Sequence, residues 1–175
     1  GDAVFAAIVA WHRAHPGLRL LGEARYRRPA KQSWEPTLHH GAPYAAYAWA
    51  TQVAEVEVDL RTYAARVLDF VSGQDAGRIL DDALARGQVA GGVAQSIGWA
   101  LFEECVWKQG ALENHQLSSY AVPTSCDVPP IRIEFVECPY GDGGQGAKGL
   151  GELPANGPAA AIANAIADAT GCDPR

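Results

Sequence analysis

Residues 141–154 combine charged side chains with a dense run of glycines. Within this stretch, Lys148 and Glu152 stand four positions apart. Glycine lets the backbone adopt positive φ angles and approach a ligand closely, and a carboxylate partly withdrawn from water could act as a general base. A flexible surface loop has the same composition, and Glu152 would then be a helix cap or a solvated acid. Composition alone therefore favours a plain loop, and the stretch is kept as a candidate site.

Two glutamines form a second polar feature, on a segment with helical periodicity. Gln88 and Gln95 are seven residues apart, so they return to nearly the same face of a helix. Glycine inside a helix costs about 1 kcal/mol relative to alanine, so Gly91, Gly92 and Gly98 need a reason. Side-chain amides each offer two donors and an acceptor, which suits a flat, polar heterocycle lying against this face. Tight helix packing is the other explanation, and the pattern alone favours it.

The hydrophobic pattern predicts the elements that must position these residues. Apolar residues at helical spacing predict helices, and alternating apolar residues predict strands. The predicted helices span residues 3–15, 88–107 and 158–169, and the predicted strands span residues 18–26, 44–59, 66–71, 116–122 and 131–136. We therefore expect an α+β domain, with a mixed or antiparallel sheet on which the helices 88–107 and 158–169 pack.

Turn and cap signals complete this expectation. Pro158 at the first helical position and Gly171 just past the end bound the last helix. Asp75 is expected to cap a helix that begins near Arg78. Residues 29–43, 108–114 and 123–130 are expected to be irregular, and the last of these segments to line an opening.

Composition excludes several classes of protein. The 175-residue chain carries a formal net charge of −6, so we expect no nucleic-acid partner. It has no apolar run near the ~20 residues that span a bilayer, and we expect no membrane contact. Its four cysteines form no C-x-x-C pair, and His39 and His40 are adjacent, so no metal ligands are predicted on this chain. Nothing marks secretion, and we expect a cytoplasmic protein with reduced, structural thiols.

Residues 144–149 satisfy the G-x-G-x-x-G pattern literally. A dinucleotide site requires this motif to open a helix inside a βαβ unit, with an acidic residue about 20 positions further on. Here Leu153 and Pro154 intervene before any helix, and no second strand follows. A nucleotide-binding module that uses the glycine loop is therefore kept only as an alternative.

Several ordered segments resemble one enzyme family. The glycine stretch resembles the C-terminal signature of the molybdenum hydroxylases, the xanthine dehydrogenase/aldehyde oxidase family. The match extends over roughly residues 22–171, with the other segments in the family's order and spacing. The segments are QVAEVEVD (52–59), DAGR (75–78), GQVAGGVAQSIG (87–98), GAKGLGE (146–152) and AIANAI (161–166).

The resemblance implies a cofactor and a role for each candidate residue. Glu152 matches the family's catalytic glutamate, which activates a water-derived oxygen for attack on an electron-poor carbon. Gln88 and Gln95 match glutamines that hydrogen-bond molybdopterin, the molybdenum cofactor, and Lys148 and Gly149 lie in the loop beside the metal. The fold implied is the family's molybdopterin-binding domain. Iron–sulfur clusters and FAD are expected on partner chains or domains.

The chain also departs from the family. Gln74 stands where the family often has a histidine, which removes any contact made by that histidine. The family's molybdenum subunit is several times longer, so residues 1–175 are expected to be the C-terminal portion of a molybdopterin-binding domain, as a fragment, a cleaved chain or a split subunit, and inactive alone. The expected substrate is an N-heterocycle or an aldehyde. A non-catalytic structural or assembly subunit is the alternative within the same complex.

Overall fold

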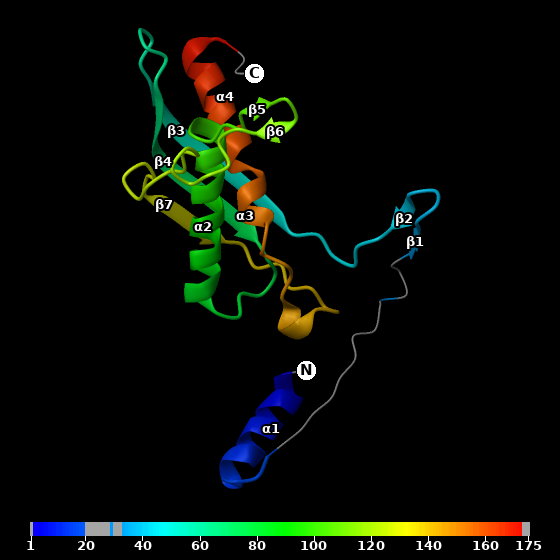
Figure 1. The fold of residues 1–175 in the computed structure, drawn as a ribbon. Helices are drawn as coiled ribbons and strands as arrows, with labels where there is room; N and C mark the ends of the chain where they lie inside the picture. The colour runs from blue at the N-terminus through cyan, green and yellow to red at the C-terminus, as the bar shows by residue number, and fades with distance from the viewer. Residues whose placement is uncertain (1, 20–28, 30–32, 173–175) are drawn as a thin grey trace.

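A three-stranded mixed sheet carries most of the chain's regular structure (Figure 1). The computed structural model describes residues 2–19, 29 and 33–172. Its helices are α1 (Asp2–Ala14), α2 (Asp82–Leu101), the 3-10 turn η1 (Gly144–Gly146), α3 (Leu153–Asn156) and α4 (Pro158–Thr170). Its strands are β1 (Ser33–Glu35), β2 (His40–Ala42), β3 (Trp49–Val58), β4 (Ala65–Asp75), β5 (Trp107–Lys108), β6 (Ala111–Leu112) and β7 (Ile131–Phe135).

The sheet has the order β3-β4-β7. β3 and β4 are antiparallel, with Trp49 opposite Asp75, and a register shift at Glu55 and Val56 marks a bulge. β4 and β7 are parallel, with Phe70 opposite Ile131. Parallel neighbours need a long crossover connection, and α2 lies within it. The predicted α+β class with a mixed sheet is confirmed.

Two helices cover one face of the sheet and form the core with it (Figure 1). α4 packs over β3, while α2 packs against α3, α4 and β7. The apolar stripe predicted for α2 is buried, since Val89, Val93 and Ile97 are each 0% exposed. The buried core cluster is Val67, Phe70, Val89, Val93, Ile97, Ile133 and Ile162. Removing such side chains from water is the main stabilising term of the fold.

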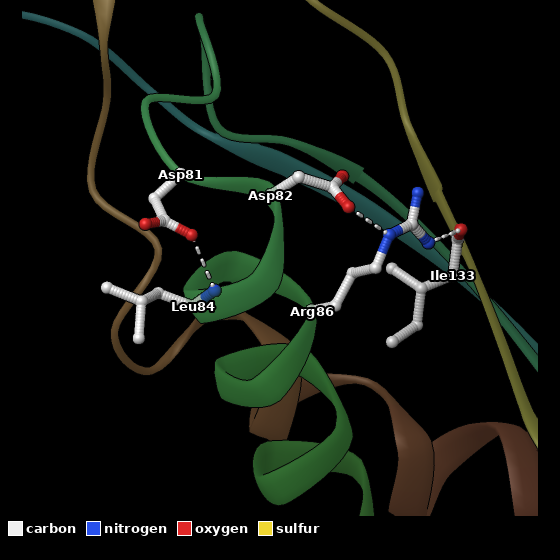
Figure 2. Close-up of polar contacts among 5 residues, drawn as sticks. All are labelled: Asp81, Asp82, Leu84, Arg86 and Ile133. Atoms are coloured by element: carbon white, nitrogen blue, oxygen red, sulfur yellow. Dashed lines mark hydrogen bonds and ion pairs between the residues drawn. The ribbon is translucent and has the colours of Figure 1, made fainter.

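Polar contacts at its first turn fix where α2 begins (Figure 2). Asp81 is the N-cap, and its carboxylate accepts a hydrogen bond from the Leu84 N–H at 3.0 Å. Arg86 donates to Asp82 at 2.8 Å and to the carbonyl oxygen of Ile133 at 2.8 Å. These contacts tie the helix to β7 and set its register. The predicted bounds 88–107 were wrong at both ends.

The predicted cap at Asp75 was also wrong. Residues 73–75 continue β4 instead of breaking it, because they pair with β3 on one side and residues 73 and 74 also pair with β7 on the other. The last helix has the predicted bounds to within a residue, with Pro158 first and Gly171 in the left-handed region at φ 70°.

Smaller elements differ from the prediction in several places. The segments 29–43 and 108–114 contain the short hairpins β1–β2 and β5–β6. Residues 116–122 form turns and irregular backbone instead of a strand. The predicted strand 18–26 falls largely outside the described residues. The first helix is confirmed as α1, and it lies apart from the sheet in Figure 1.

The composition also bears on metal ligands, cysteines and membrane-spanning helices, here within the part of the chain that the structure describes. No group of three His, Cys, Asp or Glu side chains there could hold a metal ion. The four cysteines are free and exposed, so they add nothing to the core, and the structural role predicted for them is wrong. None of the described helices has the length and apolar character needed to cross a membrane.

Candidate functional site

One cavity brings three of the predicted site residues together. Gln88 and Gln95 reach it from α2, and Glu152 reaches it from the end of the glycine-rich stretch. Its volume is about 410 Å³, within the range of small-molecule sites. The residues that line it are Gly87, Gln88, Gly91, Gly92, Gln95, Trp99, Gly151, Glu152, Ala155 and Asn156.

The two glutamine amides differ in what they already bind. The Nε2 of Gln88 donates a hydrogen bond to the carbonyl oxygen of Gly151 at 2.6 Å. This bond joins α2 to the loop one residue before Glu152. The Gln95 amide has no hydrogen-bond partner among the described residues. Gln95 is therefore ready to bind a ligand with both donors and its acceptor, while Gln88 keeps one donor and its acceptor.

The glycines of α2 serve both purposes that the sequence left open, which are tight helix packing and space for a ligand. A Cβ on Gly92 would lie 2.7 Å from the Cβ of Pro154, so this glycine allows α3 to pack closely. Gly98 faces Pro123 in the same way, where a Cβ would lie 2.8 Å from the ring. Gly91 has nothing within 4 Å of such a Cβ and lines the cavity. Close packing explains two glycines, and open space for a ligand remains at the third.

Glu152 occupies the N-cap position of α3, but its side chain makes no capping hydrogen bond. The residue is exposed and lines the cavity. Its carboxylate has no ion pair or hydrogen bond with any residue that the structure describes. If Glu152 had only a structural role, its carboxylate would be expected to cap α3, and it does not. The carboxylate oxygens are therefore free of protein partners among the described residues.

Lys148 lies away from this cavity. Its Nζ donates to Asp75 Oδ2 at 2.7 Å, and the two side chains are only 12% and 13% exposed. Burial acts to raise the pKa of Asp75. The hydrogen bonds from Lys148 and the Gly77 N–H, together with the lysine charge, outweigh burial and hold that pKa below its ordinary value of 3.8. Lys148 lines a different cavity of about 450 Å³.

Gly149 follows directly and is exposed, with open space where a side chain would stand. The G-x-G-x-x-G pattern of residues 144–149 forms η1 and then irregular backbone. The structure does not place this pattern at the start of a helix between two parallel strands, as a dinucleotide site requires.

A larger cavity of about 650 Å³ adjoins the first one along α2 and shares Gly91 and Gln95 with it. The segment 123–130, which the sequence suggested would line an opening, contributes to its wall. Glu103 lines it as well and accepts a hydrogen bond from the Tyr120 hydroxyl at 2.6 Å. This hydrogen bond raises the pKa of Tyr120 from 10.0 to about 12, with burial and the Glu103 charge acting in the same direction.

The Tyr120–Glu103 bond predicts a pH-dependent stability. Because the pKa of Tyr120 is higher in the folded chain, its contribution is complete below pH 10 and is lost as pH rises through about 12. Tyr120→Phe is therefore expected to lower the free energy of unfolding at pH 8 and to have a smaller effect at pH 11.5. Urea unfolding at both pH values measures this, with Tyr63→Phe, an exposed tyrosine, as the control. Equal effects of Tyr120→Phe at the two pH values would contradict the raised pKa.

Two further residues belong to the cavity wall. Helical spacing places Trp99 one turn beyond Gln95 on the same predicted face, and the structure confirms that it lines the cavity, although the sequence assigned it no role. Asn156 reaches the cavity from α3, a helix that the sequence did not predict because it contains four residues and a proline. The link between Asp75 and Lys148 spans 73 positions, and no local pattern signals such a contact.

Helix amides and a loop carboxylate around a small cavity have the composition of a small-molecule site. Comparison with known proteins identifies the family: residues 3–129 match the molybdopterin cofactor-binding domain, and the chain belongs to this family. The predicted resemblance and the predicted cofactor, molybdopterin, are confirmed.

The individual similarities agree with the family. The chain is 39% identical over 126 residues to the xanthine dehydrogenase molybdenum-binding subunit of Escherichia coli O157:H7, covering 71% of this chain and 17% of that subunit. It is 36% identical over 132 residues to the aldehyde oxidoreductase of Megalodesulfovibrio gigas, covering 75% of this chain and 14% of that protein. The chain thus spans a small part of the length of these relatives.

A solved structure supports the fold independently. Quinoline 2-oxidoreductase from Pseudomonas putida 86 superposes with a TM-score of 0.64 at 40% sequence identity, over 67% of this chain and 15% of that one. The chain therefore has the fold and the sequence of the molybdopterin cofactor-binding domain, and it is similar to parts of xanthine dehydrogenase and aldehyde oxidoreductase proteins.

Proposed function

We propose that this chain completes the active site of a molybdenum hydroxylase that oxidises an N-heterocycle or an aldehyde with water as the oxygen source. Residues 1–175 would form the C-terminal portion of the molybdopterin-binding domain. The observation that carries this proposal is the convergence of Gln88, Gln95 and Glu152 on one cavity.

The cavity fits a flat, polar cofactor. Gly87 and Gly91 have no side chains, and the space beside them is open. A heterocycle could therefore lie directly against the backbone of α2. The free amide of Gln95 supplies donors and an acceptor for ring nitrogens and carbonyl groups. Gly149 could approach the cofactor through its backbone, and Lys148 would hold that part of the loop in place. These features support Gln88, Gln95 and Gly149 as cofactor-site residues, and they give Lys148 an indirect role through the loop.

When bound, the molybdenum cofactor supplies the redox chemistry and the water-derived oxygen. Glu152 takes up a proton at its carboxylate, and its lack of a competing partner leaves both oxygens available. Gln88 and Gln95 orient the cofactor, and the Gln88–Gly151 bond sets the distance between α2 and the base. The chain would thus contribute a base and a binding face, and the remaining chains would contribute the rest.

Exposed apolar surfaces support a larger assembly. Trp49, at the start of β3, is 69% exposed, and Val136, directly after β7, is 62% exposed, and both side chains line one cavity. The apolar side chains of α1, which include Val4 and Phe5, are also exposed. Exposed apolar side chains, where they are contiguous, mark interaction sites. We propose as partners the rest of the molybdopterin subunit and iron–sulfur and flavin subunits, in a cytoplasmic complex, without which this chain is inactive.

Cofactor content tests the amide face directly. Gln88→Ala and Gln95→Ala in the complete enzyme are each expected to lower the molybdenum and pterin content per mole of purified protein, because each removes hydrogen bonds to the cofactor. We expect each variant to bind the cofactor about tenfold more weakly. This is the effect of losing one charge-assisted hydrogen bond or several neutral ones. Metal analysis and pterin fluorescence measure it.

The matched control is Gln116→Ala, since Gln116 lies in a turn outside the cavity. Unchanged cofactor content in the Gln88 and Gln95 variants would refute the proposed binding face. The alternative is a structural or assembly subunit. An activity assay of the copurified complex separates the two, because a complex in which these variants keep full activity would favour that alternative.

A further inference from the structure

The glycine-rich stretch is attached to the sheet at one short segment. The N–H of Lys148 donates to the carbonyl oxygen of Ala76 at 2.8 Å, and the N–H of Arg78 donates to that of Gly146 at 3.0 Å. Between these two hydrogen bonds, Gly77 and Ala147 pair as an isolated antiparallel β-bridge. These contacts join the end of β4 to residues 146–148, which are distant in sequence.

Only glycine fits at the centre of this attachment. Gly77 has a φ of +69°, which side-chain-bearing residues rarely adopt. A Cβ there would also collide with the carbonyl oxygen of Gly146 and lie 3.0 Å from the Cγ of Lys148. The loop therefore approaches the strand end as closely as backbone atoms allow, and the position of residues 146–148 is tightly restricted.

The Asp75–Lys148 ion pair closes the attachment. Asp75 Oδ2 accepts from Lys148 Nζ at 2.7 Å, and Asp75 Oδ1 accepts from the Gly77 N–H at 3.0 Å. Both charged side chains are nearly buried, so removal of either would leave the other buried without a counter-charge. The other described ion pairs are much more exposed, as in Arg132 with Asp69 at 66% and 31%. Exposed pairs contribute little, whereas this one is built into the fold.

The attachment lies four residues before Glu152, and the chain between them contains two glycines. Gly149 and Gly151 each have open space around them, so they restrain the backbone weakly. Two contacts hold the far side: Leu150 packs against the core, and Gln88 donates to Gly151. The backbone that leads to Glu152 is thus held between an ion pair with β4 and a hydrogen bond from α2.

We propose that Asp75 and Lys148 are positioning residues, whose ion pair fixes the loop so that the Glu152 carboxylate stays at the distance its reaction requires. The inference rests on the proposed function of Glu152 and extends it to two residues outside the cavity. Misplacing a reacting group by about 1 Å can cost about 100-fold in rate. Loss of the ion pair is therefore expected to reduce turnover without removing the base or the cofactor contacts.

The test uses the complete enzyme with Asp75→Asn, Lys148→Met and both changes together. Each single variant is expected to lower kcat by about 10- to 100-fold, with KM within about threefold of the parent and with unchanged molybdenum content. The double variant is expected to lose no more than the worse single variant, because the two residues act as one unit. Arg132→Met, which breaks an exposed pair, is the control and should leave kcat unchanged.

Hydrogen–deuterium exchange gives a readout that does not depend on turnover. Amides of residues 146–152 should exchange faster in the Asp75 and Lys148 variants, while those of α2 and α4 should not change. Unchanged exchange together with unchanged kcat would overturn the proposal. Loss of molybdenum from either variant would overturn it too, because Lys148 would then support cofactor binding itself. If Lys148→Met does not fold, Asp75→Asn, which keeps the shape of the side chain, carries the same test.

These outcomes are distinguishable from failure of the proposed function. If Glu152→Gln retains full activity, the proposed base is wrong, whatever the loop does. If Glu152→Gln is inactive and the Asp75 and Lys148 variants are fully active with unchanged exchange, the base is right and the positioning role is wrong.

Discussion

Glu152→Gln in the complete enzyme is expected to lower turnover by about 10²- to 10⁴-fold, the contribution typical of a general base. Glutamine keeps the size and hydrogen-bonding shape of the side chain but cannot take up a proton at neutral pH. The carboxylate makes no capping hydrogen bond to α3, so its replacement should not disturb the helix. Molybdenum content and the free energy of unfolding should therefore stay at the parent's values. Steady-state kinetics with an N-heterocycle and with an aldehyde measure the loss.

The matched control is Glu55→Gln, which removes an equal charge from an exposed position on β3. We expect this variant to keep the parent's kcat, since Glu55 is not part of the cavity wall. Turnover of the Glu152 variant within about tenfold of the parent would rule out the general-base role. A loss of cofactor in the same variant would instead assign Glu152 to binding.

Gly92→Ala and Gly91→Ala are expected to change stability in opposite directions, although the two glycines are neighbours on one helix. At Gly92 the new methyl group would stand 2.7 Å from Pro154 Cβ and 3.2 Å from the Ala155 nitrogen, so α3 must move. Overpacking of this kind costs about 1–3 kcal/mol. At Gly91 nothing lies within 4 Å, and alanine should stabilise the helix by up to about 1 kcal/mol.

Urea unfolding of the chain, followed by circular dichroism, measures both changes. Each variant is the other's control, because the substitution and the helix are the same. A stabilised Gly92→Ala variant would show that α3 is free to shift. Since α3 follows Glu152 directly, Gly92→Ala should also lower turnover of the complete enzyme, whereas a loss of activity in Gly91→Ala would point to contact with the cofactor.

The sequence predicted the long elements because their side chains alternate or recur with a clear period. The buried stripe of α2 and the strands β3 and β7 follow from this. The continuation of β4 through residues 73–75 could not be predicted, since Gly73-Gln74-Asp75 has the composition of a turn. β4 is the central strand, and Gln74 is buried at 1% exposure with a hydrogen bond to Ser72. Pairing on both sides overrides the local preference there.

The site was only partly predictable from the residues themselves. The helical spacing of Gln88 and Gln95 placed both amides on one face, and the structure confirms that they line one cavity. Nothing local indicated that Glu152 would join them, because the loop returns to α2 only after β7. That expectation came from the family resemblance, which supplies the long-range contact that periodicity cannot. The roles of these residues stay predictions until the substitutions are measured.

The distant contacts of β4 also have a consequence for the order of folding. Phe70 pairs with Ile131, and Asp75 binds Lys148 across 73 positions. Closing such large loops costs chain entropy before any contact is gained, whereas the β3–β4 hairpin closes across a short turn. The hairpin and α2 are therefore expected to form early, and the strand end that anchors Glu152 is expected to meet its loop last. A chain arrested before that step would have most of its secondary structure but not the assembled candidate site.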